Sequence, residues 1–177
     1  SYNVETWIRG FAQNESGQWL FALDTTPFYA ESGGQVSDQG TIQQGQRTWS
    51  VVDVRKEGDL IIHVCDGSEQ PEPEPVIARI DFDKRKATTR NHTGTHMLHA
   101  ALKQIIGQHV NQAGSIVHPD YLRFDFTHSE RLNSDQVEEI ERLVNRKIRE
   151  NIDLNVFETG YRQAVDSGVT ALFGEKY

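Results

Sequence analysis

The sequence has only one cysteine, Cys65, and no long apolar run. A single cysteine excludes an internal disulfide and favours a reducing compartment. The longest strongly apolar stretch, LIIHVC, is far too short to cross a bilayer, and no charged and then apolar leader opens the sequence. We therefore expect a cytoplasmic protein, or a piece of one, that has no membrane partner.

Positive charge is also scarce, because the formal net charge is −8. This balance argues at first against a nucleic-acid partner. Acidic residues are absent between Lys84 and Lys103, however, where five basic residues lie. Such a local cationic stripe can still contact phosphates, since screening makes nearby charges matter more than distant ones. A solvated helix start is the alternative interpretation.

Residues 1–83 predict a small, β-rich, barrel-like unit. The stretches at 18–30, 47–54 and 59–65 are rich in aromatic and β-branched residues, and Gly58 provides a hairpin turn between the last two. Three prolines in SEQPEPEP (68–75) exclude a helix or a central strand, so we expect an extended surface loop there. One more strand is expected over 76–82.

Residues 84–177 predict a mixed unit, which makes the fold class α+β. Apolar residues at helical spacing predict a helix over about 88–110, and alternation predicts a strand over 121–126. An amphipathic helix is expected over 133–151, with Asn133 or Ser134 as its N-cap. A strand over 155–160 and a short helix ended by Gly168 follow. The apolar stripe of the amphipathic helix consists of Val137, Ile140, Val144 and Ile148.

Three of the seven histidines fall within the stretch RNHTGTHMLHAALK. On a helix, His92, His96 and His99 lie within about 60° of one another, and Lys103 shares their face. Two histidines four residues apart can ligate one metal ion, so His92 and His96 are half of a zinc site. The alternative is that the three side chains merely line a helix surface. The single histidines His109, His118 and His128 are interpreted as structural or surface residues, and Cys65 as a small core residue.

A second suggestive stretch is TPFYAESGGQVSDQG (26–40). Gly33 and Gly34 can adopt positive φ and let the backbone approach a ligand closely. Gln35 adds an amide donor and acceptor beside that turn. An ordinary β-turn after a strand is the alternative.

Taken together, these stretches resemble the editing region of alanyl-tRNA synthetases. The resemblance rests on TPFYAESGGQVSDQGTI, then ARIDFDKRKATTRNHTGTHMLHAALKQIIGQHVNQAGSIV, then LRFDFTHSERL and the closing ALFGEKY, in matching order and spacing along nearly the whole chain. Free-standing alanyl-tRNA editing proteins are similar as well. The resemblance implies hydrolysis of seryl- or glycyl-tRNA(Ala), because an amino-acid pocket discriminates poorly against an isostere that only adds a hydroxyl.

The resemblance also implies site residues. His92 and His96 would bind zinc, with a cysteine and a histidine from a later Cys-x-x-x-His segment, while Gln112 would lie near the pocket and the turn with Gln35 would face it. We further hypothesise that Gln35 and Gln112 hydrogen-bond the aminoacyl group, and that Thr95 contacts a serine hydroxyl. Contacts to the single-stranded 3′ end of tRNA(Ala) are expected from the glycine turn and the basic residues. These residues are Gly33, Gly34, Lys86, Arg90 and Lys103.

The chain stops before the expected Cys-x-x-x-His segment, so we expect it to be a fragment that binds zinc weakly and deacylates poorly. ATP binding and alanine activation are expected in a separate aminoacylation domain, and the rest of the synthetase chain is an expected partner. A free-standing trans-editing deacylase is one alternative. A tRNA-binding module without catalysis is another.

Overall fold

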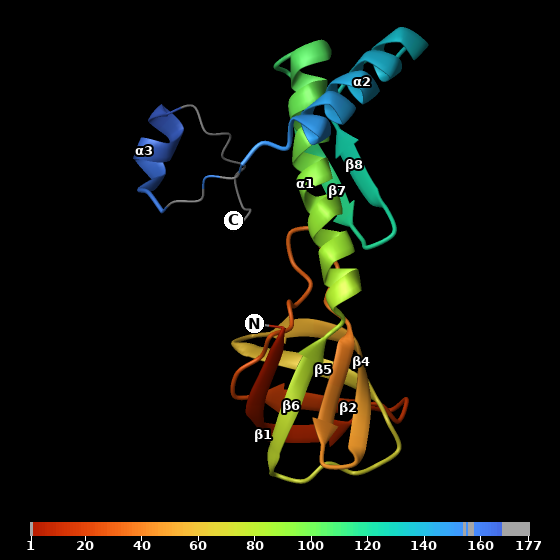
Figure 1. Ribbon diagram of the computed structural model, residues 1–177, viewed down its shortest axis with the longest axis vertical. Helices are drawn as coiled ribbons and strands as arrows, with labels where there is room; N and C mark the ends of the chain where they lie inside the picture. Colours follow the sequence, from red (N-terminus) through yellow and green to blue (C-terminus); the bar gives the residue numbers. More distant parts are fainter. Residues whose placement is uncertain (1, 154, 156–157, 168–177) are drawn as a thin grey trace.

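The computed structural model of this protein describes residues 2–153, 155 and 158–167. A small barrel forms one end of the molecule, and a long helix rises from it with a β-hairpin and a second helix at its side (Figure 1). The fold class is therefore α+β, as the sequence predicts. The expected strand over 155–160 falls partly outside the described residues, and the expected helix stop at Gly168 lies wholly outside them.

Six strands close the barrel in the order β1-β2-β5-β4-β3-β6, with every neighbouring pair antiparallel. The strands predicted over 47–54, 59–65 and 76–82 are confirmed, and Gly58 forms the hairpin turn with a φ of 60°. The stretch at 18–30 is a strand only as far as Leu23, and the rest of it enters a long loop. The bounds are β1 Asn3–Gln13, β2 Trp19–Leu23, β3 Gly40–Gln44, β4 Arg47–Glu57, β5 Leu60–Asp66 and β6 Pro75–Ile80.

The barrel interior is a packed apolar core. Along β6 the side chains alternate between exposed and buried, as expected for a strand with one face inward. Phe21 and Trp49 meet edge to face with ring centroids 5.3 Å apart, and both are fully buried. Cys65 is also fully buried, and burial raises the pKa of its thiol, so it is a small core residue as expected.

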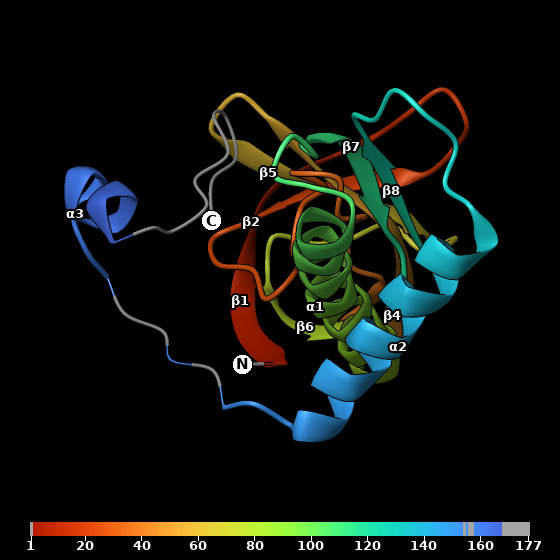
Figure 2. The same cartoon turned by 90° about the horizontal axis from the view of Figure 1, so that it is seen from above.

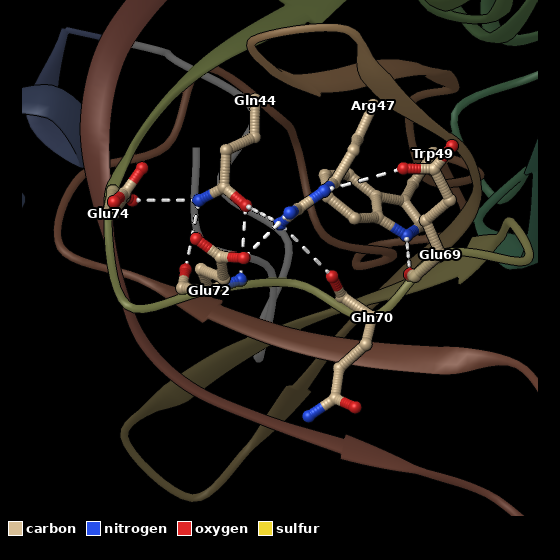
Figure 3. A network of polar contacts seen from close by, with 7 residues as sticks. All are labelled: Gln44, Arg47, Trp49, Glu69, Gln70, Glu72 and Glu74. Carbon is tan, nitrogen blue, oxygen red and sulfur yellow. Dashed lines mark hydrogen bonds and ion pairs between the residues drawn. The ribbon is translucent and has the colours of Figure 1, made fainter.

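The proline-rich loop lies at the surface, as expected, and packs over one end of the barrel (Figure 3). The Gln44 side chain donates to the Glu72 carbonyl (2.9 Å) and accepts from the Glu72 amide (3.0 Å). The indole N–H of Trp49 donates to the Glu69 carbonyl at 2.9 Å. Pro71 is the one buried residue of the loop, and its neighbours over 68–75 are exposed. The backbone of this loop thus provides hydrogen-bond partners for the Gln44 amide and the Trp49 indole at this end of the barrel.

Helix α1 (Phe82–Ile105) follows β6 almost directly. Asp81 is its N-cap, and the carboxylate accepts from the backbone N–H of Lys84 at 3.0 Å. The helix therefore begins six residues earlier than the apolar spacing predicts, because the cap and not the apolar stripe defines its start. His92 and His96 lie near its middle.

A second core joins α1 to strand β8 (Leu122–Phe126) and helix α2 (Ser134–Glu150), and strand β7 (Gln112–Val117) pairs with β8 (Figure 2). The predicted helix over 133–151 is confirmed, with Asn133 as N-cap in a capping box. Its buried residues are Ile140 and Leu143, whereas Val137 and Ile148 of the expected stripe are 50% and 54% exposed. A short helix α3 (Tyr161–Asp166) follows. Among the described helices, none has the length and apolar character needed to span a bilayer.

Candidate functional site

The glycine pair forms a tight turn in the loop between β2 and β3. Gly33 and Gly34 both have positive φ, 58° and 80°. The backbone groups of Ser32 and Gln35 pair across the turn, with N···O distances of 3.0 and 3.2 Å. This geometry is why glycine is needed at both positions, and it points the Gln35 side chain away from the barrel strands toward α1.

This turn docks on strand β7. Val117 N–H donates to the Gly34 carbonyl at 2.7 Å, and Val36 N–H donates to the Val117 carbonyl at 3.1 Å. The fit is close, since a Cβ at Gly34 would lie 2.5 Å from both the carbonyl and the hydroxyl oxygen of Ser115. The barrel loop is thus fixed to the hairpin beside α1 by backbone contacts.

Docking brings Gln35 to the histidine helix. The amide oxygen of Gln35 lies 2.7 Å from Nδ1 of His92, across 57 residues of sequence. Because this oxygen can only accept, Nδ1 of His92 carries the proton, and Nε2 of the neutral ring has the lone pair. A hydrogen bond to one imidazole nitrogen is the usual way in which proteins fix the other nitrogen for metal ligation.

The rings of His92 and His96 lie side by side on α1. They are stacked with centroids 5.2 Å apart and an interplanar angle of 25°. Within the described part of the chain, no third His, Cys, Asp or Glu joins them in a metal-binding group. Two histidines could supply at most two of the four ligands of a tetrahedral zinc ion, and zinc binding by His92 and His96 stays a prediction.

Two other residues of α1 near this pair, His99 and Thr95, are buried. His99 is buried and packs against Phe124 of β8, with ring centroids 5.1 Å apart, so it is separate from the exposed part of the face. Thr95 is also buried, at 5% exposure, and its hydroxyl donates to the Asn91 carbonyl at 2.9 Å. The contact of Thr95 with a serine hydroxyl stays a prediction.

Gln112 begins β7 and reaches the glycine turn indirectly. Its amide N–H donates to the Ser115 hydroxyl at 3.2 Å, and Ser115 is the residue against which Gly34 packs. Ser115 is a site residue that the sequence analysis missed, because no local pattern marks a serine that contacts a turn some eighty positions earlier in the chain. Gln35, Gln112 and His92 thus belong to one contiguous region.

The basic residues expected to contact tRNA are spread along α1. Lys86 and Arg90 are exposed, and Lys86 Nζ lies 5.9 Å from the centre of the Phe82 ring. Lys103 is half-buried, about 10 Å along the helix axis beyond His96. Lys86 and Arg90 lie within about 40° of each other around the helix, whereas Lys103 lies on the face of His92 and His96, at least about 100° away from both, so the three residues do not form one cluster.

A buried ion pair anchors the loop that carries the turn. The guanidinium of Arg85 donates to both carboxylate oxygens of Asp38, with Nε 2.7 Å from Oδ1, and also to the Pro27 carbonyl at 3.1 Å. The Asp38 carboxylate further accepts from the Tyr29 amide at 2.6 Å. The hydrogen bond with Asp38 raises the pKa of Arg85 above its ordinary value. This pair ties the first turn of α1 to the loop.

A buried histidine holds the start of the same loop. His63 Nδ1 donates to the Phe21 carbonyl at 3.0 Å, so Nε2 accepts from the Thr26 hydroxyl at 2.7 Å. Burial lowers the pKa of His63, which keeps the ring neutral. His63 therefore has a structural role, which the sequence analysis did not predict.

Comparison with known proteins places this geometry in context. The family described as tRNA synthetases class II (A) matches residues 7–84. The chain is 51% identical over 156 residues to the alanine–tRNA ligase of Thermotoga maritima, covering 86% of this chain and 18% of the relative. The corresponding protein of Cytophaga hutchinsonii is 47% identical over 161 residues (90% and 18%), and that of Bacteroides fragilis 43% over 177 residues (98% and 20%). The chain spans about a fifth of the length of the curated relatives it matches.

Proposed function

Because the chain belongs to the alanyl-tRNA synthetase family, we propose that it carries part of an editing site that hydrolyses seryl- or glycyl-tRNA(Ala). The parent protein would be a cytoplasmic alanine–tRNA ligase, with ATP-dependent aminoacylation in another domain of the same chain. The observation that carries the proposal is the contact between Gln35 and His92, which joins the glycine turn of the barrel loop to the His-x-x-x-His helix.

The chain's own residues can orient an aminoacyl ester. Gln35 fixes the tautomer of His92 and keeps an amide N–H for a second acceptor, such as the ester carbonyl. Gln112 provides another amide beside the same turn. Thr95, in turn, would contact the hydroxyl of a misattached serine, with its oxygen as acceptor, since its proton is given to Asn91.

Zinc is the proposed cofactor, held by Nε2 of His92 together with His96. When bound, the metal supplies positive charge that polarises an oxygen or an amino group of the substrate. Ligands from beyond the described residues, or water, would complete the coordination shell.

The tRNA end is proposed to enter along α1. Lys86 and Arg90 are exposed and no acidic residue lies between Lys84 and Lys103, so this helix has favourable charge for the phosphates of a single strand. Gly33 and Gly34 are exposed at the turn and lack side chains that would block the terminal nucleotide.

The test is hydrolysis of seryl-tRNA(Ala) and zinc content, for this chain and for one extended through the family's Cys-x-x-x-His segment. We expect the longer chain to bind zinc and to hydrolyse the ester, and His96→Ala to abolish both. Gln35→Ala should lower the rate of hydrolysis about 10-fold to 100-fold. This is the usual loss, about 10-fold to 100-fold, when the residue that hydrogen-bonds a metal-ligating histidine is removed. Gln35→Glu is the matched control, because its carboxylate still accepts from His92 Nδ1.

The outcomes separate the alternatives. Full hydrolysis by the 177-residue chain alone would favour a free-standing deacylase. Binding of tRNA(Ala) that survives His92→Ala, with no hydrolysis by either chain, would favour a binding module without catalysis.

A further inference from the structure

A second pair of histidines lies outside the site described above. His109, between α1 and β7, and His128, just after β8, have Nε2 and Nδ1 respectively 2.9 Å apart. Their rings are stacked, with centroids 5.2 Å apart and planes inclined by 28°. An open pocket lies beside them, lined by His109, Phe126, Thr127, His128 and Ser129.

The backbone holds this pair firmly. Thr127 N–H donates to the Asn111 carbonyl at 2.9 Å, and Asn111 N–H donates to the Thr127 hydroxyl at 3.0 Å. The His109 carbonyl accepts from both the Asn111 side-chain amide (3.0 Å) and the Thr127 hydroxyl (3.2 Å). These contacts extend the pairing of β7 and β8 by one step and place the two rings opposite each other.

The spacing of the two nitrogens suits two ligands of one metal ion. With metal–nitrogen bonds of about 2.0–2.1 Å, ligands at right angles have nitrogens about 2.9 Å apart, and tetrahedral ligands about 3.3 Å apart. Right-angled nitrogen ligands are typical of copper(II) and nickel(II). Imidazole suits both metals, and copper(II) is bound most tightly of the divalent first-row ions.

We propose that His109 and His128 form a binding site for a divalent transition-metal ion of the copper(II) or nickel(II) class. In the metal-free pair one ring donates its N–H to the other. On binding, that proton leaves the contact and reappears on the other nitrogen of the same ring, so both facing nitrogens offer lone pairs and a neutral pair takes the metal without net proton release. No third His, Cys, Asp or Glu of the described residues joins them, so water fills the remaining positions.

The site is distinct from the pair of His92 and His96. To test it alone, these two histidines are first replaced. Copper(II) is titrated into the 177-residue chain carrying His92→Asn and His96→Asn, with electron paramagnetic resonance to count bound nitrogens. We expect one site with coupling to two nitrogens. His109→Gln or His128→Gln should each weaken it about 100-fold, because the second ligand no longer binds intramolecularly.

His118→Gln is the matched control, since His118 is a partly exposed histidine that stacks on Tyr121 at the other end of the hairpin. Equal loss in this control, or no loss in His109→Gln and His128→Gln, overturns the proposal. If either variant fails to fold, NMR of the unaltered chain tests whether His109 and His128 bind the metal. Substoichiometric copper(II) should broaden the ring protons of His109 and His128, and broadening that spares both overturns the site.

Discussion

Gly34 packs against Ser115 so closely that no side chain fits between them. The position of its missing Cβ lies 2.5 Å from the carbonyl oxygen of Ser115, and the φ of Gly34 is 80°. This contact between a barrel loop and strand β7 is what places Gln35 beside His92. The glycine turn is therefore as much a part of the candidate site as the histidines.

We predict that Gly34→Ala lowers the free energy of unfolding by roughly 3 kcal/mol, from backbone strain and overpacking together. The measurement is urea denaturation, with the ¹⁵N shifts of the His92 ring as a report on its tautomer. Gly33→Ala is the matched control, because Gly33 also has positive φ (58°) but has no atom within 4 Å of its missing Cβ. It should cost roughly 1 kcal/mol from strain alone and leave the His92 ring unchanged. Equal effects of the two substitutions would contradict the docking contact.

The ion pair of Arg85 and Asp38 gives a second prediction. Asp38 is only 7% exposed, so Arg85→Ala leaves a buried carboxylate without its cation, at a cost of roughly 3 kcal/mol. Urea denaturation measures the loss. Arg142→Ala removes an exposed ion pair with Glu138 on α2 and should cost less than about 1 kcal/mol. A loss from Arg85→Ala no larger than this would show that the anchor contributes little.

The buried His63 predicts how stability depends on pH. Its pKa is lowered in the folded chain, mainly by burial, whereas the unfolded chain has the ordinary value of about 6.5. The unfolded state therefore takes up a proton first as the pH falls, and the contribution of His63 to stability is present above about pH 6.5 and lost below it. Denaturation from about pH 8 to about pH 5 should show this decline. In His63→Gln the decline should be smaller, and an identical decline would assign the effect to other groups.

The basic residues of α1 predict a salt effect on RNA binding. Replacing Lys86, Arg90 and Lys103 together by alanine should reduce the salt slope of tRNA(Ala) binding by about 0.7 for each phosphate that the protein no longer neutralises. Fluorescence anisotropy between about 50 and about 200 mM salt measures the slope. Alanine at Arg142, Arg146 and Arg149 is the charge-matched control, because acidic residues are interspersed with these arginines on α2. Equal slopes for the two triple variants would remove α1 from the binding surface.

Local patterns in the sequence predicted much of the fold. Aromatic and β-branched residues predicted β4 and β5, a further strand was expected at β6, and alternating apolar residues predicted β8. Asn133 or Ser134 as N-cap predicted where α2 begins, and the structure has Asn133 in that role. The prediction of which α2 residues are buried was less accurate. Leu143 and not Val137 faces the core, because the packing of α2 on α1 decides which side of the helix is covered. The sequence predicted a barrel-like unit but not the pairing of β1 with β6 that closes it. These two strands are the first and last of the barrel, and pairing between strands so far apart in the chain leaves no local pattern.

The candidate site shows the same division. Helical spacing alone was enough to bring His92 and His96 together, since both are on one helix. The contact of His92 with Gln35 was only implied by the resemblance to a known family, because it depends on a loop that docks by its backbone. The pairing of His109 with His128 was not predicted at all. Each looks like an isolated histidine until β7 and β8 pair and set them opposite each other.

The closed barrel has a consequence for self-association. A sheet with free edges offers unpaired N–H and C=O groups to any extended chain it meets, and many proteins aggregate in this way. Here β1 to β6 pair around a full circle, so the apolar, β-branched N-terminal part of the chain presents no edge strand as a template. In the second sheet the glycine turn occupies part of the free edge of β7. Among the strands of the described residues, β8 keeps its whole outer edge unpaired and β7 keeps the part that the glycine turn does not reach, so intermolecular strand pairing would have to begin in this hairpin.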